Sequence, residues 1–206
     1  MLQLFNSRSQ QRERFRPVPG RPVRVYVCGI TPYDTTHLGH AFTYVTFDTL
    51  MRLMRHGHGW PVRYVQNLTD IDDDVLRKAA ETGEDWRALG LRWTDLFRGD
   101  LAWLNLVPPD VYPGATSVMS QIIGHVATLI TRGLAYESGG SVYFAVGADP
   151  DFAADLRLDR ASLLDIANER GNHPDDPGKR DPLDFVLWQA GKPGEPAWHS
   201  PWSAGR

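Results

Sequence analysis

The sequence contains one cysteine, no long apolar run and little imbalance of charge, and each absence excludes a class of protein. Cys28 stands alone among 206 residues, so an internal disulfide framework is impossible and a reducing compartment, the cytoplasm, is expected. No stretch is apolar enough over a sufficient length to span a bilayer, and the first residues lack a signal-peptide pattern, so no membrane partner is predicted. The formal net charge of −3 excludes a general coating of nucleic acid.

What is present is enough apolar sequence for a folded core. With 42% hydrophobic and 23% charged residues, the chain can form one large domain, or a domain with an insertion. Short β-branched runs and apolar residues at steps of three and four predict a buried strand, a helix and a second strand, at residues 24–28, 38–56 and 62–65. Such a unit normally has parallel strands and a right-handed crossover, so the fold class is predicted to be α/β.

The rest of the sequence predicts mostly helices, with strands towards its end. Apolar periodicity predicts further helices over residues 75–82, 86–106, 117–131 and 161–167. Asp72 and Asp73 are expected to cap the first of these rather than to bind a metal. A hairpin is expected around the turn at 138–140, and a last buried strand at 185–188. The tail after residue 193 is expected to lack a closing element.

The densest chemical signal lies between the first strand and the first helix, at residues 28–40. Ligands of open parallel sheets bind beyond the carboxyl ends of the strands, where a helix amino terminus offers N–H groups to phosphate. His37 and His40 would lie on one face of the first helical turn, with Gly39 allowing close approach. They can donate hydrogen bonds to a triphosphate and to charge developing at its α-phosphorus. The structural alternative is that His37 caps the helix and His40 packs on it.

These residues also carry a resemblance. The segment His37-Leu38-Gly39-His40 resembles the His-Ile-Gly-His signature of class I aminoacyl-tRNA synthetases, and residues 26–40 are similar to those of cysteinyl-tRNA synthetases. Ile30 and Pro32 match mycothiol cysteine ligases instead, because the tRNA enzymes usually have proline and valine there. The similarity covers most of the chain, continuing through residues 64–73, 85–90, 177–184 and 187–188.

The resemblance implies a fold, a reaction and partners. The fold would be an incomplete Rossmann-like (HUP-type) parallel sheet with an α+β connective insertion. Its parts would be a lead-in, the first half of the nucleotide-binding catalytic domain, and the insertion with a truncated return, at residues 1–22, 23–110 and 111–206. L-Cysteine and ATP with Mg²⁺ would form cysteinyl-adenylate, and the amine of glucosaminyl-inositol would then take the cysteinyl group. Transfer to tRNA is the second hypothesis, and a non-catalytic module that binds ATP or an adenylate is the third.

The same resemblance assigns site residues. His37 and His40 would be catalytic, and the residues contacting ATP or the adenylate would be Cys28, Gly29, Ile30, Thr31, Gly39, Thr43, Asn67, Leu68 and Thr69. Composition alone would explain residues 67–69 as an ordinary turn. Cys28 would be the first of four ligands of a Zn²⁺ ion that binds the substrate thiolate. Its structural alternative is core filling, which is the commoner role of a lone cysteine in a strand.

Two departures from the family pattern bear on activity. The second zinc cysteine, the remaining zinc ligands and the Lys-Met-Ser-Lys-Ser-type loop of the family have no counterpart in the sequence. Residues 169–174 stand where the mycothiol enzyme has Glu-Arg-Gly-Gly-Asp-Pro, and they differ from it at Asn172 and His173, which leaves acceptor recognition open. The chain alone is therefore expected to be weak or inactive unless a partner chain or self-association supplies the missing half.

Overall fold

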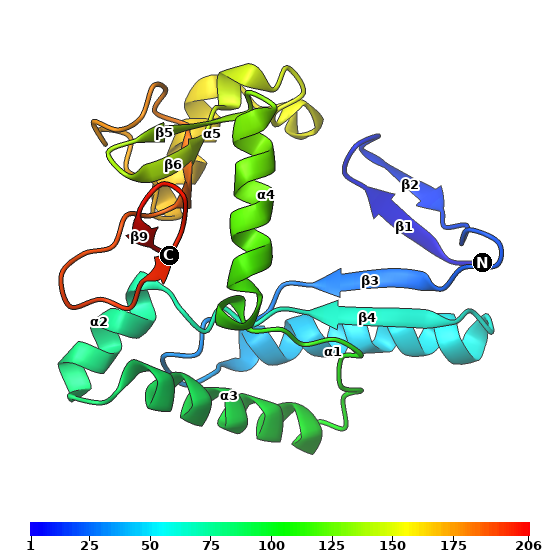
Figure 1. Cartoon of the computed structure of the whole chain (residues 1–206). Coiled ribbons are helices and arrows are strands. Elements are labelled where there is room, and N and C mark those ends of the chain that lie inside the picture. The colour runs from blue at the N-terminus through cyan, green and yellow to red at the C-terminus, as the bar shows by residue number, and fades with distance from the viewer. The chain divides into compact units, whose positions relative to one another are not determined.

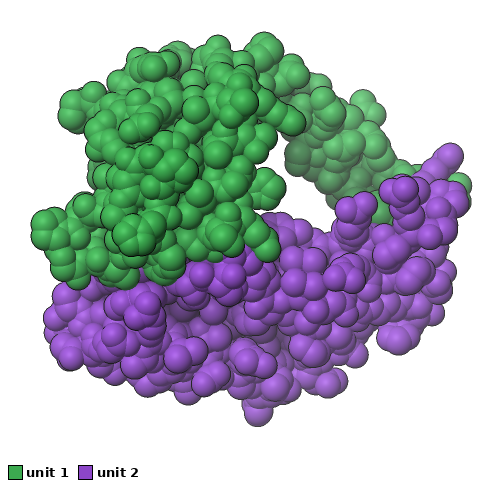
Figure 2. All heavy atoms as spheres, viewed as in Figure 1, with its two compact units in different colours: residues 1–15, 119–206 green, residues 16–118 purple.

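The computed structural model describes residues 1–206, which divide into two compact units (Figure 2). Unit 2 comprises residues 16–118, and unit 1 comprises residues 1–15 and 119–206. These units are defined by packing alone, so the functional boundaries expected after residues 22 and 110 stay a prediction. No helix of the chain combines the length and the apolar character that crossing a bilayer requires.

The centre of unit 2 is a pair of parallel strands. β3 (Val23–Val27) and β4 (Val62–Gln66) pair in register, from Val23 opposite Val62 to Val27 opposite Gln66. The helix α1 (Leu38–Arg52) connects them, so the predicted strand, helix and parallel strand are confirmed. Only isolated bridges, such as Leu68 to Gly114, extend the pairing beyond β4. The fold is therefore mixed α/β, but its parallel sheet has only two strands.

One face of this strand pair carries the core of unit 2. The helices α1 and α3 (Trp86–Trp103) both lie on that face (Figure 1). Because side chains alternate along a strand, Val23 and Val27 are buried while Arg24 and Tyr26 are exposed. The core cluster draws on β3, the turn after it, α1, β4 and α3, and consists of Val27, Ile30, Tyr44, Met51, Tyr64 and Phe97.

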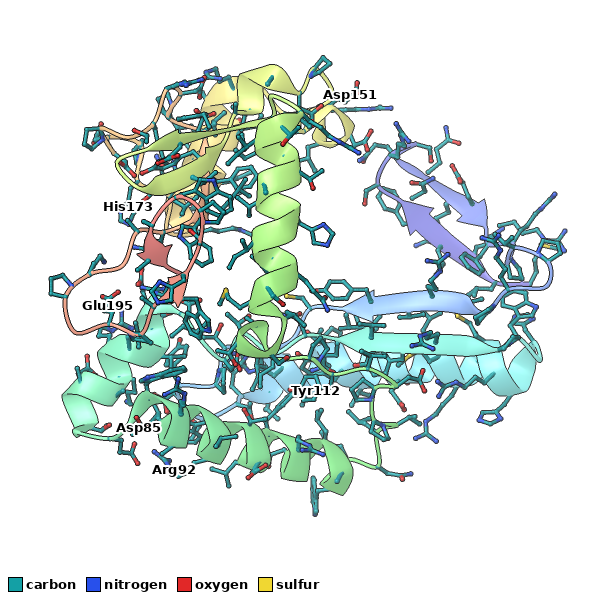
Figure 3. All side chains as sticks on the ribbon, viewed as in Figure 1. Asp85, Arg92, Tyr112, Asp151, His173 and Glu195 are labelled. Atoms are coloured by element: carbon teal, nitrogen blue, oxygen red, sulfur yellow. The ribbon has the colours of Figure 1, made fainter.

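The helix ends in unit 2 follow the capping residues of the sequence. The helix expected over 38–56 is α-helical as far as Arg52 and continues as one π-helical turn, η1 (Leu53–Gly57). α2 (Asp73–Thr82) begins after Asp72, whose carboxylate accepts from the Asp74 N–H at 3.3 Å. Asp85, labelled in Figure 3, caps α3 by accepting from two backbone N–H groups at 3.0 Å each. The capping role expected of Asp72 is confirmed, whereas Asp73 is the first helical residue.

Unit 1 combines antiparallel strands with helices. Its first strands pair as a hairpin, β1 (Gln3–Asn6) with β2 (Gln11–Arg14). A second sheet has the order β5-β6-β7, formed by β5 (Ala135–Ser138), β6 (Ser141–Phe144) and β7 (Phe185–Trp188). The helices are α4 (Met119–Thr131), which follows the 3-10 turn η2 (Ala115–Val118) of unit 2, and α5 (Arg160–Glu169). Short 3-10 turns, η3 (Val146–Ala148) and η4 (Ala154–Leu156), lie between β6 and α5.

The expected hairpin is confirmed, and its turn explains the glycines. Ser138 pairs with Ser141, which leaves a two-residue loop of Gly139 and Gly140. Both glycines have positive φ, 58° and 81°, the conformation that a two-residue hairpin turn requires and that other residues rarely adopt.

Some expectations for unit 1 were wrong. The strand at 185–188 was expected to be buried, but Phe185 is 42% and Val186 45% exposed, and of these four residues only Trp188 is buried. The tail does close, because β8 (Trp198–His199) pairs with β9 (Ala204–Gly205). The lead-in lies on the surface as expected, but it contains the β1–β2 hairpin. The short strands of the β1–β2 and β8–β9 pairs are held together by backbone hydrogen bonds, so an apolar pattern in the sequence does not predict them.

A buried carboxylate holds the loops of unit 1 to its sheet. Asp184 is 1% exposed and accepts three hydrogen bonds: from the Tyr136 hydroxyl at 2.6 Å, the Val146 N–H at 2.9 Å and the Asp181 N–H at 3.1 Å. The Tyr136 hydroxyl in turn accepts from the Arg180 N–H at 2.7 Å. One side chain thus connects β5, the start of η3 and the segment that precedes β7.

Replacing Asp184 with alanine is expected to lower the free energy of unfolding by about 3 kcal/mol or more, because three donors would lose a charged acceptor inside the protein. Urea unfolding followed by circular dichroism measures the change. The control is Glu137→Ala at an exposed position of β5, which is expected to change stability by less than about 0.5 kcal/mol. Equal losses from the two variants would contradict the role assigned to Asp184.

Candidate functional site

Two turns meet at the carboxyl ends of β3 and β4. The Gly29 N–H donates to the side-chain oxygen of Asn67 at 2.9 Å, and the Thr69 N–H donates to the Ile30 carbonyl at 3.0 Å. The Asn67 amide nitrogen also donates to the Thr69 hydroxyl at 3.3 Å. The structure therefore brings together the turn at 28–31 and the turn at 67–69, two groups of residues that the sequence assigned to the adenylate. Their role in binding stays a prediction.

Gly29 is required by the close approach of these turns. A methyl group placed on Gly29 would overlap the backbone carbonyl oxygen of Asn67. To remove that overlap, the backbone of one of the two segments would have to shift, at a cost in folding free energy. The φ angle of Gly29 is not in the left-handed region, so space rather than conformational freedom excludes a side chain here. The sequence signal for this glycine was its position after a strand, which does not reveal its neighbour.

The turn at 67–69 is also held from its other side. The Leu68 N–H donates to the Pro113 carbonyl, and the Ala115 N–H donates to the Leu68 carbonyl, each at 2.9 Å. The Asp70 carboxylate accepts from the N–H and the hydroxyl of Thr116, at 2.9 and 2.5 Å. The expected alternative of an ordinary Asx or Ser/Thr turn at 67–69 is wrong, because Leu68 forms a bridge with Gly114 and the Thr69 N–H donates to Ile30 rather than to the Asn67 side chain. The segment is instead fixed between two neighbouring segments.

Cys28 is exposed at the end of β3, so the alternative that it fills the core is wrong. Its carbonyl oxygen accepts from the Tyr44 hydroxyl at 2.9 Å. Sequence reasoning missed Tyr26, whose hydroxyl donates to the Asn67 side chain at 2.7 Å. Partial loss of water around its hydroxyl, and then the neighbouring Cys28, raise the pKa of Tyr26 even though most of its ring is exposed, so the hydroxyl keeps its proton. The available signal was the two-residue spacing of 26 and 28, which puts both side chains on one face of the strand.

A zinc site is not formed by the residues present. No group of three or more histidine, cysteine, aspartate or glutamate residues is arranged to hold a metal ion. Zinc in a closed structural site takes four ligands, and Cys28 supplies one sulfur. The zinc expected at Cys28 therefore stays a prediction that requires ligands from elsewhere.

The two histidines cap the helix α1. The Nδ1 atom of His37 accepts from the Gly39 N–H at 3.0 Å, and the Nδ1 atom of His40 accepts from the His37 N–H at 3.2 Å. Their ring centroids lie 4.1 Å apart. Because both Nδ1 atoms are acceptors, each neutral ring carries its proton on Nε2. The structural alternative for His37 is confirmed, and it leaves two Nε2–H donors for a ligand.

Gly39 and Thr43 support this arrangement. A side chain on Gly39 would meet the ring of His37, so the glycine makes room for the cap. The Thr43 hydroxyl donates to the Gly39 carbonyl at 3.0 Å, one turn back along α1. Its proton is thereby used within the helix, and its lone pairs remain available.

A groove of about 470 Å³ lies beside the imidazoles, between the start of α1 and the end of α3. His37 and His40 line it together with Phe97, Asp100 and Trp103. The Thr36 hydroxyl donates to the Asp100 carboxylate at 2.8 Å across it. Cys28, Asn67 and Thr69 do not line this groove. The groove that the imidazoles line therefore does not include Cys28 or the segment at 67–69.

The sequence matches the family described as tRNA synthetases class I (C) catalytic domain over residues 14–206. Curated relatives include three proteins named L-cysteine:1D-myo-inositol 2-amino-2-deoxy-alpha-D-glucopyranoside ligase. The protein from Thermomonospora curvata is 50% identical over 91% of the chain and 45% of its own length. Those from Nocardia farcinica and Mycolicibacterium gilvum are 47% and 49% identical over 100% of the chain, and 50% and 46% of their own lengths. The chain spans about half the length of these relatives.

Solved structures share the fold at low sequence identity. Mycobacterium tuberculosis methionyl-tRNA synthetase in complex with methionyl-adenylate matches with a TM-score of 0.55 and 18% identity, over 74% of this chain and 36% of that one. The LeuRS of Agrobacterium radiobacter, solved as a ternary complex, matches with a TM-score of 0.52 and 16% identity, over 75% and 23%. These likenesses concern the fold alone.

Replacing Gly29 with alanine is expected to lower the free energy of unfolding by about 2–4 kcal/mol, since the turns at 28–31 and 67–69 would have to separate. Urea unfolding measures it. Gly99→Ala, in α3, is the matched control: its added methyl group meets no atom within 4 Å, and alanine favours a helix, so stability should rise by about 1 kcal/mol. A Gly29→Ala protein as stable as the control would contradict the predicted overlap.

The stability contributed by His40 is expected to fall at mildly acidic pH. Burial, and then the neighbouring His37, lower the pKa of His40 below the ordinary value for histidine. The unfolded chain therefore takes up the proton first, so the contribution is complete above pH of about 6.5 and is lost as the pH falls through the folded-state pKa. NMR titration of the imidazole protons, with His40→Asn assigning the signal, measures this pKa. A value for His40 above that of free histidine would disprove it.

Proposed function

Because the chain belongs to the family of class I (C) tRNA synthetase catalytic domains, we propose that it takes part in ATP-dependent activation of L-cysteine and its transfer to the amine of glucosaminyl-inositol. The observation that carries the proposal is the similarity to ligases named for cysteine and this aminosugar, which extends over nearly the whole chain. The capped imidazole pair and the joined turns at the strand ends support it.

The proposed reaction has two steps. A carboxylate oxygen of cysteine attacks the α-phosphorus of ATP bound with Mg²⁺, the bond to the bridging oxygen breaks, and pyrophosphate leaves. The amine of the acceptor then attacks the carbonyl carbon of cysteinyl-adenylate, the bond to AMP breaks, and the amine loses a proton. The product is an amide, and each step exchanges one bond to oxygen for one new bond at the reacting centre.

His37 and His40 are assigned to stabilising charge in the first step. Their Nδ1 atoms are occupied by the cap, so each ring can direct only an Nε2–H towards a ligand. Neutral donors fixed in position are suited to the phosphate oxygens on which charge develops. The lowered pKa of His40 keeps its ring neutral at pH 7, and the amino terminus of α1 adds a favourable dipole.

The joined turns are assigned to the adenylate. Gly29, Ile30 and Thr31 would approach it from β3, and Asn67, Leu68 and Thr69 from β4. Thr43 would accept a hydrogen bond from the ligand, since its own proton is directed to Gly39. Cys28 would contact the substrate through its exposed thiol. We assign no step to zinc, because the residues present supply one sulfur and no further ligands grouped around it.

The second half of the family chain is proposed as the partner of unit 2. Parallel sheets are normally covered on both faces, yet Tyr26 on the second face of β3 is 62% exposed. Leu38 and Phe42, one turn apart on α1, are 88% and 75% exposed. The relatives are about twice as long as the span they share with this chain. Residues 23–110 would then be half of a catalytic domain, with 111–206 as the insertion and the return towards it.

The proposal predicts cysteine-dependent exchange of labelled pyrophosphate into ATP, weak for the chain alone and strong once the remaining half of a relative is added as a separate polypeptide. His37→Asn should lower the exchange rate measured with the added second half by on the order of a hundredfold, because asparagine can still cap α1 but lacks the ring donor. The control is His125→Asn at an exposed position of α4, which should retain the rate.

Three outcomes would count against the proposal. Exchange by the isolated chain at the rate of full-length relatives would refute the need for a second half. Absence of cysteine-dependent exchange when the second half is added would refute cysteine activation. Transfer of labelled cysteine to tRNA but not to glucosaminyl-inositol would replace the proposed acceptor.

A further inference from the structure

Two arginines lie side by side on the face of the β3–β4 pair that is opposite to α1 and α3 (Figure 1). In the register of the parallel strands, Arg24 lies directly opposite Arg63. Side chains alternate along a strand, so both point away from the face on which Val23 and Val27 are buried, and both are exposed. Because neighbouring strands are only about 4.8 Å apart, two like charges placed in this way repel each other.

The sequence around the strands offers no acid to neutralise this pair. Residues 14–33 and 49–69, which contain β3 and β4, include no aspartate and no glutamate. Neither Arg24 nor Arg63 takes part in an ion pair or a side-chain hydrogen bond. Both guanidinium groups therefore have all of their donors free.

The acid on the segment next to β4 is already engaged. An isolated bridge between Val65 and Val111 places Asp110 beside β4. The Asp110 carboxylate accepts from the Tyr64 N–H at 2.7 Å and pairs with Arg55 at 3.9 Å. It holds its own segment against β4 and does not compensate the two arginines.

The same face has an apolar end. Tyr26 follows Arg24 by two residues and lies directly opposite Val65. The ring of Tyr26 is 62% exposed, and its hydroxyl is fixed by the Asn67 side chain. We call Arg24, Arg63, Tyr26 and Val65 the bare face. Its cationic end lies towards the amino ends of the strands and its apolar end towards their carboxyl ends, about 7 Å away.

The charge pair restricts what can cover this face. Parallel sheets are normally covered on both faces. An apolar cover would take two unpaired guanidinium groups out of water, which is strongly unfavourable. A carboxylate placed between them can accept hydrogen bonds from both, in the geometry that a guanidinium group favours.

We propose that an acidic segment of the second half of the family chain covers the bare face, with a carboxylate between Arg24 and Arg63 and an apolar side chain on Tyr26 and Val65. The inference rests on the proposed function, which takes the second half as the partner of unit 2. It adds the chemistry of the contact. Because a segment without the carboxylate would leave the two charges buried and unpaired, the arginines also select the partner.

The test measures association of the full chain with the remaining half of a relative by isothermal titration calorimetry. Arg63→Glu is expected to weaken association by at least about tenfold, since its carboxylate would repel that of the partner. The same substitution should raise the urea midpoint of the chain alone, because residue 63 would then attract Arg24 instead of repelling it. A variant that merely folded poorly would lower both quantities.

Arg87→Glu is the matched control. It makes the same change of charge at an exposed position of α3, on the other face of the strand pair, and should leave the affinity unchanged. Arg63→Gln removes the charge without reversing it and keeps the test decisive if Arg63→Glu fails to fold. Raising the salt from about 0.1 to about 1 M should weaken association of the unchanged chain more than that of Arg63→Gln.

The outcomes separate this inference from the proposed function. If the unchanged halves associate and exchange pyrophosphate, equal affinities of Arg63→Glu and Arg87→Glu would overturn the inference alone. Absence of both association and exchange would overturn both. Weaker binding of Arg63→Glu to single-stranded RNA, with unchanged affinity for the second half, would assign the arginines to nucleic acid and overturn the inference.

Discussion

The candidate site depends on one contact, between the backbone of Gly29 and the side chain of Asn67. Parallel strands bring their carboxyl ends to one edge of a sheet, but the turns that follow can still diverge. Here a single side-chain oxygen of Asn67 accepts from both the Gly29 N–H and the Tyr26 hydroxyl, at 2.9 and 2.7 Å. The missing side chain at Gly29 lets the backbone of the second turn approach. Everything assigned to the adenylate at these two turns follows from that approach.

The histidine pair shows why a structural role and a chemical role need not compete. Capping uses Nδ1 of both rings, which decides the tautomer and the ring orientation, and it leaves Nε2 as the only donor of each ring. A histidine that did not cap would be free to present either nitrogen. The cap is therefore part of what would make the pair selective for phosphate oxygens, and the lowered pKa of His40 keeps its ring neutral at neutral pH.

Local patterns in the sequence were sufficient for the elements but not for their contacts. Apolar spacing predicted the strand, helix and strand of unit 2, and two glycines predicted the turn of the β5–β6 hairpin. The hydrogen bond from Tyr26 to Asn67 joins residues 41 apart, and only the register of β3 on β4 brings them together. The β8–β9 pair has no apolar signal, and the exposure of Cys28 depends on which elements cover its face of the sheet.

The one-sided core of unit 2 separates its folding from its chemistry. Val27, Tyr44 and Phe97 are each 5% exposed or less, so the face of the sheet that carries α1 and α3 is well packed. The opposite face carries Arg24, Arg63 and Tyr26, all exposed, and supplies little to the core. The core of unit 2 therefore does not depend on cover over that face. The second half proposed above, if it lies on that face, would close the site over the strand ends while adding little to the packing of α1 and α3 on the sheet.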